Sequence, residues 1–388
     1  MPTDAGGIHL DRSAENGDAI AVLAGRLARS GGGAVGLPTL LSDLNRQAHR
    51  SHGWFGHAAH RAYTWDRHDR GSTEWWPQGI SSSADASTSG VVEGRRVLMV
   101  TWYARVSPDR PRGEAPGSRL TFLDLDTLRY RHVLLVVPTL RGNRLAVSPL
   151  HVHAGGAVWC GPLVHVAATG SGLVTCRLDD LMRVPDGHEW GAAADTAVSS
   201  AGYRYFLPVR SRYRAHADPG RPGLRYSFLS LDRGAPASLV VGEYGRGQQT
   251  TRLACYPLDV ETGLLTAGAD GLARPDFVGQ GVPHMQGAVT VEGSWYVTAS
   301  RGPGTPGRCS SVRRGGCGPP ARGADGPRGP RLLAVQRRAL DAHRAPASPM
   351  AGQPAAVAAR RLTRRGTRRL VLRAGGHAAR RAGSTTGP

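Results

Sequence analysis

The chain has 388 residues, a formal net charge of +20 and a hydrophobic fraction of 40%. No segment approaches the roughly 20 apolar residues of a membrane-spanning helix, and no cysteine spacing matches a zinc knuckle or a CxxC redox pair. The charge would suggest nucleic acid or an anionic membrane as partner. However, residues 301–388 carry 19 Arg against two Asp, or +17, which leaves only +3 for residues 1–300.

Residues 1–70 are expected to form a short helical lead-in with loops. Ile20, Leu23 and Leu27 recur at helical spacing, and Pro38 begins a second apolar segment of the same period. No basic region followed by an apolar run precedes them. The sequence as written therefore predicts a cytoplasmic protein.

Residues 71–300 change to the period of β-strands. Val97–Tyr103 (VLMVTWY) and His132–Val137 (HVLLVV) are dense apolar runs, Leu120–Leu125 (LTFLDL) alternates, and Gly, Asp and Pro separate such segments up to Ala299. This pattern predicts an all-β domain. Trp75, Trp76, Trp102, Trp159 and Trp295 are expected to pack inside it rather than to bind carbohydrate.

Two short phrases recur along this region. The first phrase is a polar or small residue followed by a glycine, ahead of an expected strand. It occurs at Gln78–Gly79, Gly155–Gly156 and Gln286–Gly287. Apolar strands end in aspartates that we expect to cap turns, namely Asp124, Asp126, Asp179, Asp180, Asp232 and Asp259. The repeats predict a β-propeller with about five recognisable blades, each a four-stranded antiparallel meander of some 40 to 50 residues. A sandwich or an irregular all-β domain is the alternative.

Residues 301–388 differ from everything before them. They contain no Phe, Trp or Tyr, and 60 of the 88 residues are Arg, Ala, Gly or Pro. So little apolar surface does not offset the entropy of ordering the backbone, so we expect a disordered Arg-rich tail. Reading a GC-rich gene out of frame would produce this composition and leave the propeller incomplete. Translation of the neighbouring frame after Ser300 tests this hypothesis.

Several phrases of residues 60–300 carry a family resemblance. They are WWPQGISSSADAS, LTFLDLDTLRYRHVLLVVP, HVHAGGAVW, SFLSLDR and PHMQGAV. The region resembles a group of uncharacterised actinobacterial propeller proteins, many of them secreted. The resemblance implies a propeller and, as the alternative to the cytoplasm, an extracellular location, but it implies no catalytic residue. Members of the group usually begin with an export signal and continue past PHMQG with aromatic-rich β sequence, which this chain lacks.

Seven polar residues are candidates for a ligand site in the channel of such a propeller. They are Gln78, Asp85, His151, His153, Glu243, His284 and Gln286. His151 and His153 would share one face of a strand and could present two imidazoles to a divalent metal, with a third ligand from His284, Asp85 or Glu243. Hydrogen bonding within the blades is the simpler interpretation, and we assign no metal site.

The motifs of common enzymes are absent. The chain has no Gly-x-Ser-x-Gly, HExxH, P-loop or dinucleotide fingerprint, and no cofactor is indicated. We therefore expect a monomeric, non-catalytic protein that binds a small molecule, a glycan or another protein. One alternative is a metal-assisted hydrolase or lactonase. Another is nucleic-acid binding through the tail, whose arginines at 360–369 lack interleaved aromatic residues.

Overall fold

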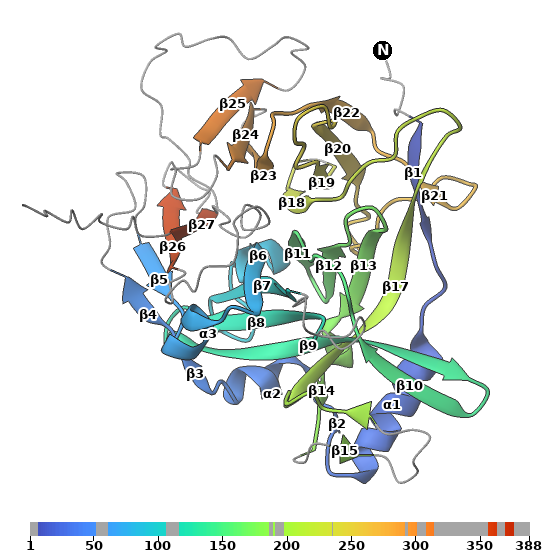
Figure 1. The fold of residues 1–388 in the computed structure, drawn as a ribbon, viewed down its shortest axis with the longest axis vertical. Helices are drawn as coiled ribbons and strands as arrows, with labels where there is room; N and C mark the ends of the chain where they lie inside the picture. Colours follow the sequence, from blue (N-terminus) through green and yellow to red (C-terminus); the bar gives the residue numbers. More distant parts are fainter. Residues whose placement is uncertain are drawn as a thin grey trace, which may run out of the picture.

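The computed structural model is mostly β-sheet, which confirms the predicted all-β class (Figure 1). The structure describes residues 7–51, 61–105, 116–185, 189–190, 198–234, 236–291, 294–300, 308–313, 356–362 and 369–375. Its main strands form five units, each of three or four strands. Four of these units follow one another along the chain, and the fifth combines segments from both ends.

The first unit is a four-stranded antiparallel meander. Its strands are β6 (Trp75–Ser82), β7 (Val97–Ala104), β8 (Ser118–Asp124) and β9 (Arg129–Arg141), and β10 (Arg144–Pro149) pairs with the end of β9. Side chains alternate between the two faces, so Leu98, Val100 and Trp102 pack on one side and Val97 and Met99 on the other. Because both faces are buried, the β7 segment reads as one continuous apolar run.

The second unit is joined to the first through its outer strand. Its strands are β11 (Ala157–Cys160), β12 (Leu163–Ala167), β13 (Gly172–Arg177) and β17 (Tyr205–Ala217). β17 runs antiparallel to β13, and its residues Phe206 to Pro208 run parallel to β9. The eight strands of the two units, together with six further strands that pair beside them, form one 14-stranded sheet. The end strands β6 and β11 also contact each other, so this sheet is nearly closed.

The remaining units complete the β structure. The third consists of β18 (Phe228–Asp232), β19 (Ser238–Gly242), β20 (Arg252–Pro257) and β22 (Phe277–Gln280). The fourth consists of β23 (Met285–Val291), β24 (Ser294–Ala299) and β25 (Arg308–Arg313). The fifth consists of β4 (His49–Ser51), β5 (Arg61–Thr64), β26 (Ala356–Leu362) and β27 (Arg369–Gly375). β5 pairs with β26, so this sheet joins the two ends of the chain.

Consecutive units share hydrophobic clusters. The residue pairs that mark these clusters are Tyr63 and Trp102 between the fifth and first units, Phe122 and Trp159 between the first and second, Leu173 and Leu239 between the second and third, and Val240 and Trp295 between the third and fourth. Each unit therefore covers a face of its neighbour. The predicted packing role holds for Trp102, Trp159 and Trp295, which are at most 2% exposed.

The first strands of four units approach one another closely. β6 contacts β11, β11 contacts β18, and β18 contacts β23. At these contacts a Cβ on Gly79 would lie 2.4 Å from the Cα of Gly156, and a Cβ on Gly156 would lie 2.2 Å from the backbone nitrogen of Leu229. Only glycine leaves room for this approach of backbone to backbone. Two of the three recurring glycine phrases, at Gly79 and Gly156, thus mark places where neighbouring units meet, whereas a Cβ on Gly287 would meet only Thr298 of its own unit.

Three of the six aspartates at strand ends cap turns, as predicted. Asp124, Asp232 and Asp259 each accept a hydrogen bond from the backbone N–H two residues later, at 2.9, 3.1 and 2.9 Å. Asp180 instead forms an ion pair with Arg210. The cap explains why an acidic residue follows an apolar strand so regularly.

The N-terminal region contains more than the expected helices. α1 (Gly17–Arg29) and α2 (Gly36–Ser42) form as predicted, with Leu23 and Leu27 fully buried. A strand that we did not expect, β1 (Ile8–Arg12), pairs along its length with β17. The shorter elements of the chain are β2 (Gly33–Ala34), β3 (Arg46–Gln47), α3 (Arg67–Gly71), α4 (Ser83–Ala86), η1 (Leu178–Asp180), β14 (Met182–Arg183), β15 (Glu189–Trp190), β16 (Val198–Ser199) and β21 (Leu272–Ala273).

The tail corrects one expectation. Disorder was predicted for all of residues 301–388, but the structure describes three strands there, β25, β26 and β27. β25 pairs with β24 and β26 pairs with β5, because strands at sheet edges offer free backbone groups to a polar partner segment as readily as to an apolar one. The other residues of the tail lie outside the described part of the chain. Within the described part, no helix has the length and apolar character needed to cross a membrane.

Candidate functional site

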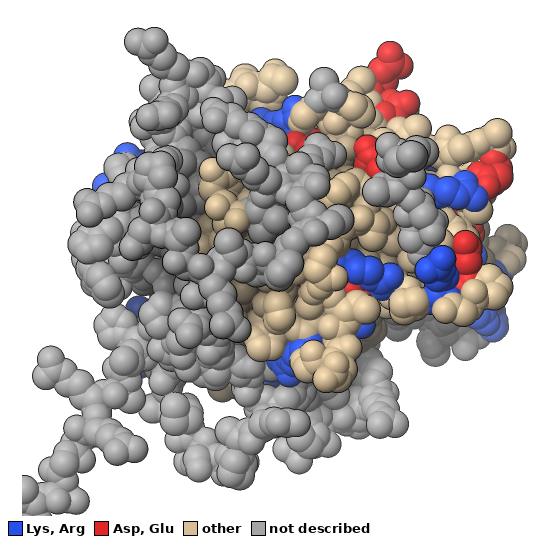
Figure 2. Space-filling view, turned by 90° about the horizontal axis from the view of Figure 1, so that it is seen from above, with Lys and Arg blue, Asp and Glu red and all other residues tan. Residues whose placement is uncertain are grey.

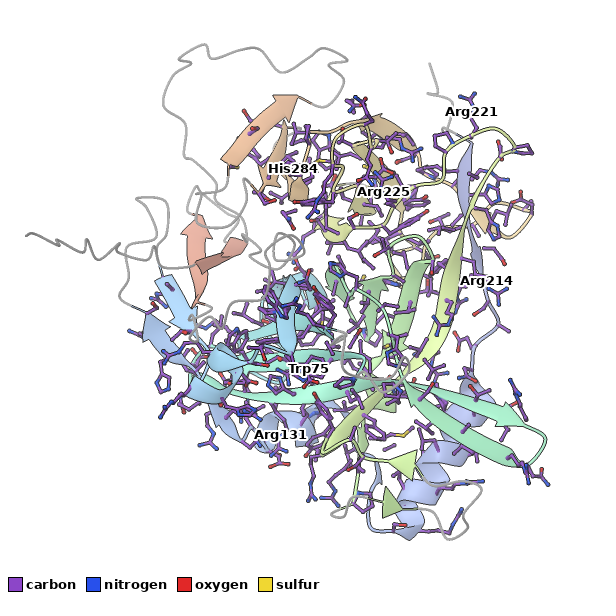
Figure 3. All side chains as sticks on the ribbon, in the orientation of Figure 1. Trp75, Arg131, Arg214, Arg221, Arg225 and His284 are labelled. Carbon is purple, nitrogen blue, oxygen red and sulfur yellow. The ribbon has the colours of Figure 1, made fainter. Side chains whose placement is uncertain are left out.

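A pocket of about 900 Å³ lies where β8, β9 and α3 meet the segments that precede β6 and β17. Small-molecule sites in proteins typically have volumes of about 300 to 1,000 Å³. The lining residues on which its chemistry depends are Asp43, Arg46, Glu74, Trp75, Arg119, Arg131, His132, Tyr203 and Arg204. In Figure 3, Trp75 and Arg131 lie beside β9, far from His284 near β23.

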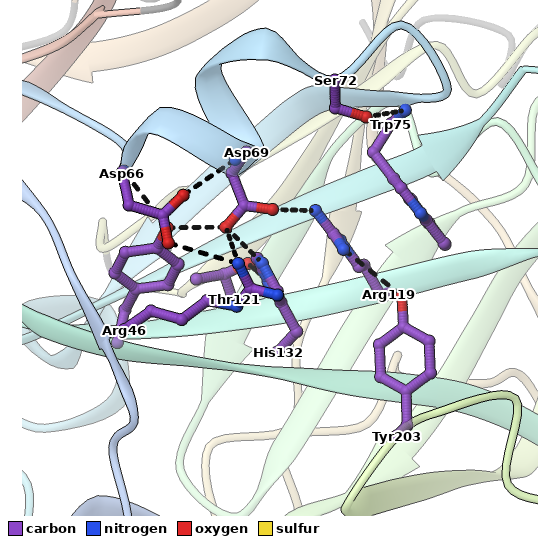
Figure 4. Close-up of polar contacts among 10 residues, drawn as sticks. Arg46, Asp66, Asp69, Ser72, Trp75, Arg119, Thr121, His132 and Tyr203 are labelled. Carbon is purple, nitrogen blue, oxygen red and sulfur yellow. Dashed lines mark hydrogen bonds and ion pairs between the residues drawn. The ribbon is translucent and has the colours of Figure 1, made fainter. Parts of the chain in front are cut away.

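Asp69 organises the wall of this pocket. Asp66 caps the short helix α3 by accepting the backbone N–H of Asp69 at 2.8 Å. The carboxylate of Asp69 then faces β8 and β9, where Arg119, Tyr130 and His132 donate hydrogen bonds to it at 3.1, 2.6 and 2.8 Å (Figure 4). One buried carboxylate therefore holds a helix and two strands together.

The charge on Asp69 is stabilised although the side chain is only 2% exposed. Burial raises the pKa of the carboxyl, but hydrogen bonds from His132 and Tyr130 and the positive charge of Arg119 outweigh it and hold the pKa well below its usual range. Burial and the neighbouring Asp69 raise the pKa of the Tyr130 hydroxyl. Tyr130 thus stays a hydrogen-bond donor and Asp69 stays ionised.

His132 is neutral in this environment. Burial and the charge of Arg119 lower the pKa of its imidazole to about 4. Because the Asp69 carboxylate only accepts hydrogen bonds, Nε2 of His132 carries the proton and Nδ1 accepts from the hydroxyl of Thr121, at 2.6 Å. The chain of bonds runs from Thr121 through His132 to Asp69.

This order of residues is that of a nucleophile, a base and an orienting carboxylate. However, the side chain of Thr121 is 0% exposed and is not among the residues that line the pocket. A substrate in the pocket would not reach its hydroxyl. The geometry therefore supports a structural role for these three residues.

Arg119 is the most constrained cation of the pocket. Its guanidinium lies 4.3 Å from the ring centre of Trp75 and 4.7 Å from that of Trp102, and it donates to Asp69 and to the Tyr203 hydroxyl. Its Nε is buried without a hydrogen-bond partner among the described residues. Because this atom is not exposed to the pocket, Arg119 offers a bound molecule its positive charge rather than a free donor.

Two further arginines are fixed by carboxylates. Arg131 donates through Nη2 to Asp43 at 2.9 Å and lies over the ring of Tyr205. Arg46 uses Nη1 for Asp66 at 3.2 Å and Asp69 at 3.3 Å. These bonds leave Nη1 of Arg131 and Nη2 of Arg46 without partners among the described residues, so both guanidinium groups retain donors while their positions are set.

The network predicts a loss of stability in mild acid. His132 titrates at about 4 when folded and at about 6.5 when unfolded. The unfolded state therefore binds more protons between these values, and the free energy of unfolding should fall as the pH drops from 6.5 towards 4. Asp69, whose pKa is depressed by folding, should add a further loss below about pH 4. Urea unfolding at pH 7.0 and 4.5 measures this, and His132→Gln should show a shallower pH dependence than the wild type.

Most of the seven residues predicted as channel ligands have other partners. Asp85 takes part in the capping box of α4, accepts from the Ser81 hydroxyl at 2.9 Å and pairs with Arg233 at 3.1 Å. Glu243 is fully buried and accepts from the backbone and guanidinium of Arg252, which hold its pKa low despite burial. Both carboxylates are thus satisfied by protein groups.

The histidine candidates are not on strands. His151 and His153 lie in the segment before β11, where His151 is exposed and His153 packs against Tyr103 at 4.4 Å between ring centres. The expected shared strand face is therefore wrong, because the strand begins only at Ala157. His284 stacks on Tyr244 at 5.3 Å. Within the described ranges, no three His, Cys, Asp or Glu residues are grouped so that they could hold a metal ion.

Gln78 and Gln286 are the two candidates that remain without full hydrogen bonding. Both are buried, at 2% and 7% exposure. Gln78 has no partner for either amide atom among the described residues, and Gln286 has none for its oxygen. Neither lines the pocket at Arg119.

One signal for the pocket is present in the sequence. Arg119 and His132 are polar residues at buried positions of β8 and β9, directly before the apolar residues Leu120 and Val133. A charged side chain in such a strand needs a partner, since an unpaired buried charge is costly. Nothing in the spacing identified Asp69, some 50 residues earlier, as that partner. Comparisons with family models, curated proteins and solved structures found no match for this chain.

Proposed function

We propose that this chain is a non-catalytic propeller-type binding protein and that the pocket at Arg119 takes a small anionic molecule. The stacking of five units in order, with the first strands of four of them adjacent, is the arrangement expected of a propeller. Binding without catalysis agrees with the inaccessible Thr121 hydroxyl. One observation carries the choice of ligand: four arginines line one pocket.

The arginines are suited to a carboxylate or phosphate group. Arg119 is held between two indole rings and Arg131 by Asp43, so little side-chain entropy is lost when a ligand binds. A planar guanidinium offers two parallel N–H donors to such an anion. Only two acidic residues, Asp43 and Glu74, line the pocket against the four arginines.

The nucleic-acid alternative gains no support from the one face of the molecule that Figure 2 shows. On the face shown in Figure 2, arginines and acidic residues lie next to one another rather than in a patch of one sign. Backbone recognition of nucleic acid requires a continuous basic surface. The tail arginines on which that hypothesis depends lie largely outside the described residues.

Isothermal titration with citrate and with inorganic phosphate tests the proposal. Arg131→Gln should weaken binding of the effective anion by about tenfold or more, because a charged hydrogen bond contributes about 1.5 to 3 kcal/mol. Arg129→Gln is the matched control. Arg129 lies two residues away on β9, donates to the backbone oxygen of Leu44 and does not line the pocket, so its loss should change the affinity less than twofold.

Binding should also weaken as salt rises, since the contact is between charges. Equal effects of the two substitutions would show that the pocket is not the binding site. Failure of both anions to bind the wild-type protein would refute the proposed ligand class for a pocket of this size.

A further inference from the structure

The pocket at Arg119 lies at a break in the pairing of β9. On its edge away from β8, β9 pairs with β3 through residues 129–130 and with β17 through residues 134–136. Residues 131–133 pair with neither of these strands, and two of them line the pocket. The pocket therefore occupies the space between the end of β3 and the beginning of β17.

The lining residues come from strands that are far apart in the first unit. Trp75 lies on β6 and Arg131 on β9, and β7 and β8 separate these two strands. At the usual spacing of about 4.8 Å between neighbouring strands, β6 and β9 are roughly 14 Å apart. In Figure 4, Arg119 of β8 lies between Trp75 and Arg46 of β3. The pocket therefore has two ends, and a bare phosphate or acetate ion would fill only one of them.

Positive charge is incompletely neutralised at the Arg131 end. Arg131 bonds to Asp43, and Arg46 and Arg204 line the same pocket. Burial, together with the charges of Arg204 and Arg46, lowers the pKa of Arg131, although Asp43 opposes the shift. A lowered pKa means that the surroundings disfavour the charged guanidinium. An acidic group placed beside it would therefore be stabilised.

A hydrogen-bond acceptor lies next to these donors. The side chain of Asp43 is 44% exposed and bonds to Arg131 and to the Tyr205 hydroxyl, at 2.9 and 2.7 Å. A carboxylate has about four acceptor positions, so Asp43 keeps some of them for a bound molecule. An anion without O–H groups would be repelled by this carboxylate, whereas a hydroxyl group would donate to it. We therefore expect a ligand that carries hydroxyl groups near its acidic group.

Neutral polar groups line the Trp75 end. The Oγ of Ser72 accepts the backbone N–H of Trp75 at 3.0 Å, so the hydroxyl proton of Ser72 remains to be donated. Thr73 is exposed, and its hydroxyl makes no hydrogen bond with the described residues. Both groups suit a ligand whose far end also carries hydroxyl groups.

Apolar surface in the pocket is small. Apart from glycines and Tyr203, the described apolar lining residues are Trp75, Pro116 and Ala201. Trp75 is only 9% exposed, and Arg119 covers one face of its ring at 4.3 Å while Tyr203 packs edge-on at 6.3 Å. An alkyl chain would gain little from burial here, and a nucleotide base would find no open indole face to stack on.

We propose that the pocket binds an acidic sugar, a monosaccharide that carries one phosphate or carboxylate group. The inference rests on the proposed function, because it requires the arginines to hold the acidic group. This group would lie at Arg131 and Arg204, and the sugar hydroxyls would extend past the unpaired part of β9 towards Thr73.

Isothermal titration of the full chain with three phosphate esters tests the inference. Glucose 6-phosphate should bind at least about tenfold more tightly than methyl phosphate, because each hydroxyl that bonds to the protein increases affinity by about two- to tenfold. Hexyl phosphate, which has six carbons and no hydroxyl, should bind no more tightly than methyl phosphate. Glucuronate and acetate form the equivalent pair for a carboxylate, and the larger of the two advantages identifies the acidic group. Glucose alone should bind far more weakly than either acidic sugar.

Thr73→Val tests where the sugar lies. It removes one hydroxyl at similar volume from an exposed position, and circular dichroism should confirm the fold. It should reduce the advantage of glucose 6-phosphate over methyl phosphate by about two- to tenfold. Thr266→Val is the matched control, since Thr266 is also exposed and does not line the pocket, and the advantage should be unchanged. Arg131→Gln should weaken the binding of both phosphate esters.

The inference is overturned, and the proposed function is not, if methyl phosphate or acetate binds in a manner that depends on Arg131 but neither acidic sugar binds more tightly than its small counterpart. Tighter binding of hexyl phosphate than of glucose 6-phosphate would likewise exclude a sugar. An unchanged advantage in Thr73→Val would overturn the proposed position of the hydroxyls. If none of these anions binds the wild-type protein, both the inference and the proposed function fail.

Discussion

Gly156→Ala is expected to remove at least about 3 kcal/mol of stability and to leave little folded protein. The new Cβ would lie 2.2 Å from the backbone nitrogen of Leu229 and 2.8 Å from the backbone carbon of Phe228. These atoms belong to the beginning of the third unit, so relief of the clash would require whole sheets to separate. Urea unfolding followed by circular dichroism, together with the soluble yield, measures the loss.

Gly170→Ala is the matched control for this prediction. A Cβ at Gly170 meets no atom within 4 Å, and no positive φ is required there. The free energy of unfolding of this control should equal that of the wild type to within about 0.5 kcal/mol. Similar midpoints for Gly156→Ala and the wild type would show that the first strands of the units do not pack as described.

Asp69→Asn should destabilise the protein by about 3 to 5 kcal/mol, because it leaves buried charge without its partner. Arg119 is only 5% exposed and would lose the carboxylate that neutralises it. In the wild type, three donors bond to the two carboxylate oxygens of Asp69. An asparagine would offer these donors only one acceptor oxygen. The free energy of unfolding in urea at pH 7 measures this effect.

Asp126→Asn is the matched control, because it removes the charge of an exposed ion pair instead of a buried one. Asp126 is 49% exposed and pairs with Arg96 on the surface. Such pairs contribute about 0 to 1 kcal/mol, so this variant should remain close to the wild type. If Asp69→Asn lost no more stability than this control, the proposed organising role of Asp69 would be refuted.

The positions of the strands along the chain could be predicted because the signals that mark them are local. The apolar run of β7 and the aspartate caps at Asp124, Asp232 and Asp259 depend on neighbours within a few residues. The glycines at 79 and 156 were visible as repeats. Their cause, a backbone contact between units, became clear only from the fold.

The candidate site was much less predictable. The seven residues chosen from the sequence were judged by type and spacing, and two of them, Asp85 and Glu243, proved to be paired with arginines that lie in other segments. The pocket residues Arg46 and Arg119, and Asp69 that pairs with both, come from three separate stretches. No periodic pattern connects them, since their distances along the chain are set by loops.

The sequence by itself determined the all-β class, the positions of the first two helices and the turns that end the strands. These depend on alternation, helical spacing and caps, which act over a few residues. The tertiary structure decided the parallel pairing of β9 with β17, the joining of β5 with β26 and the assembly of the pocket around Asp69. Such contacts follow from how whole units pack on one another, and a buried charge finds its partner only when that packing brings distant segments together.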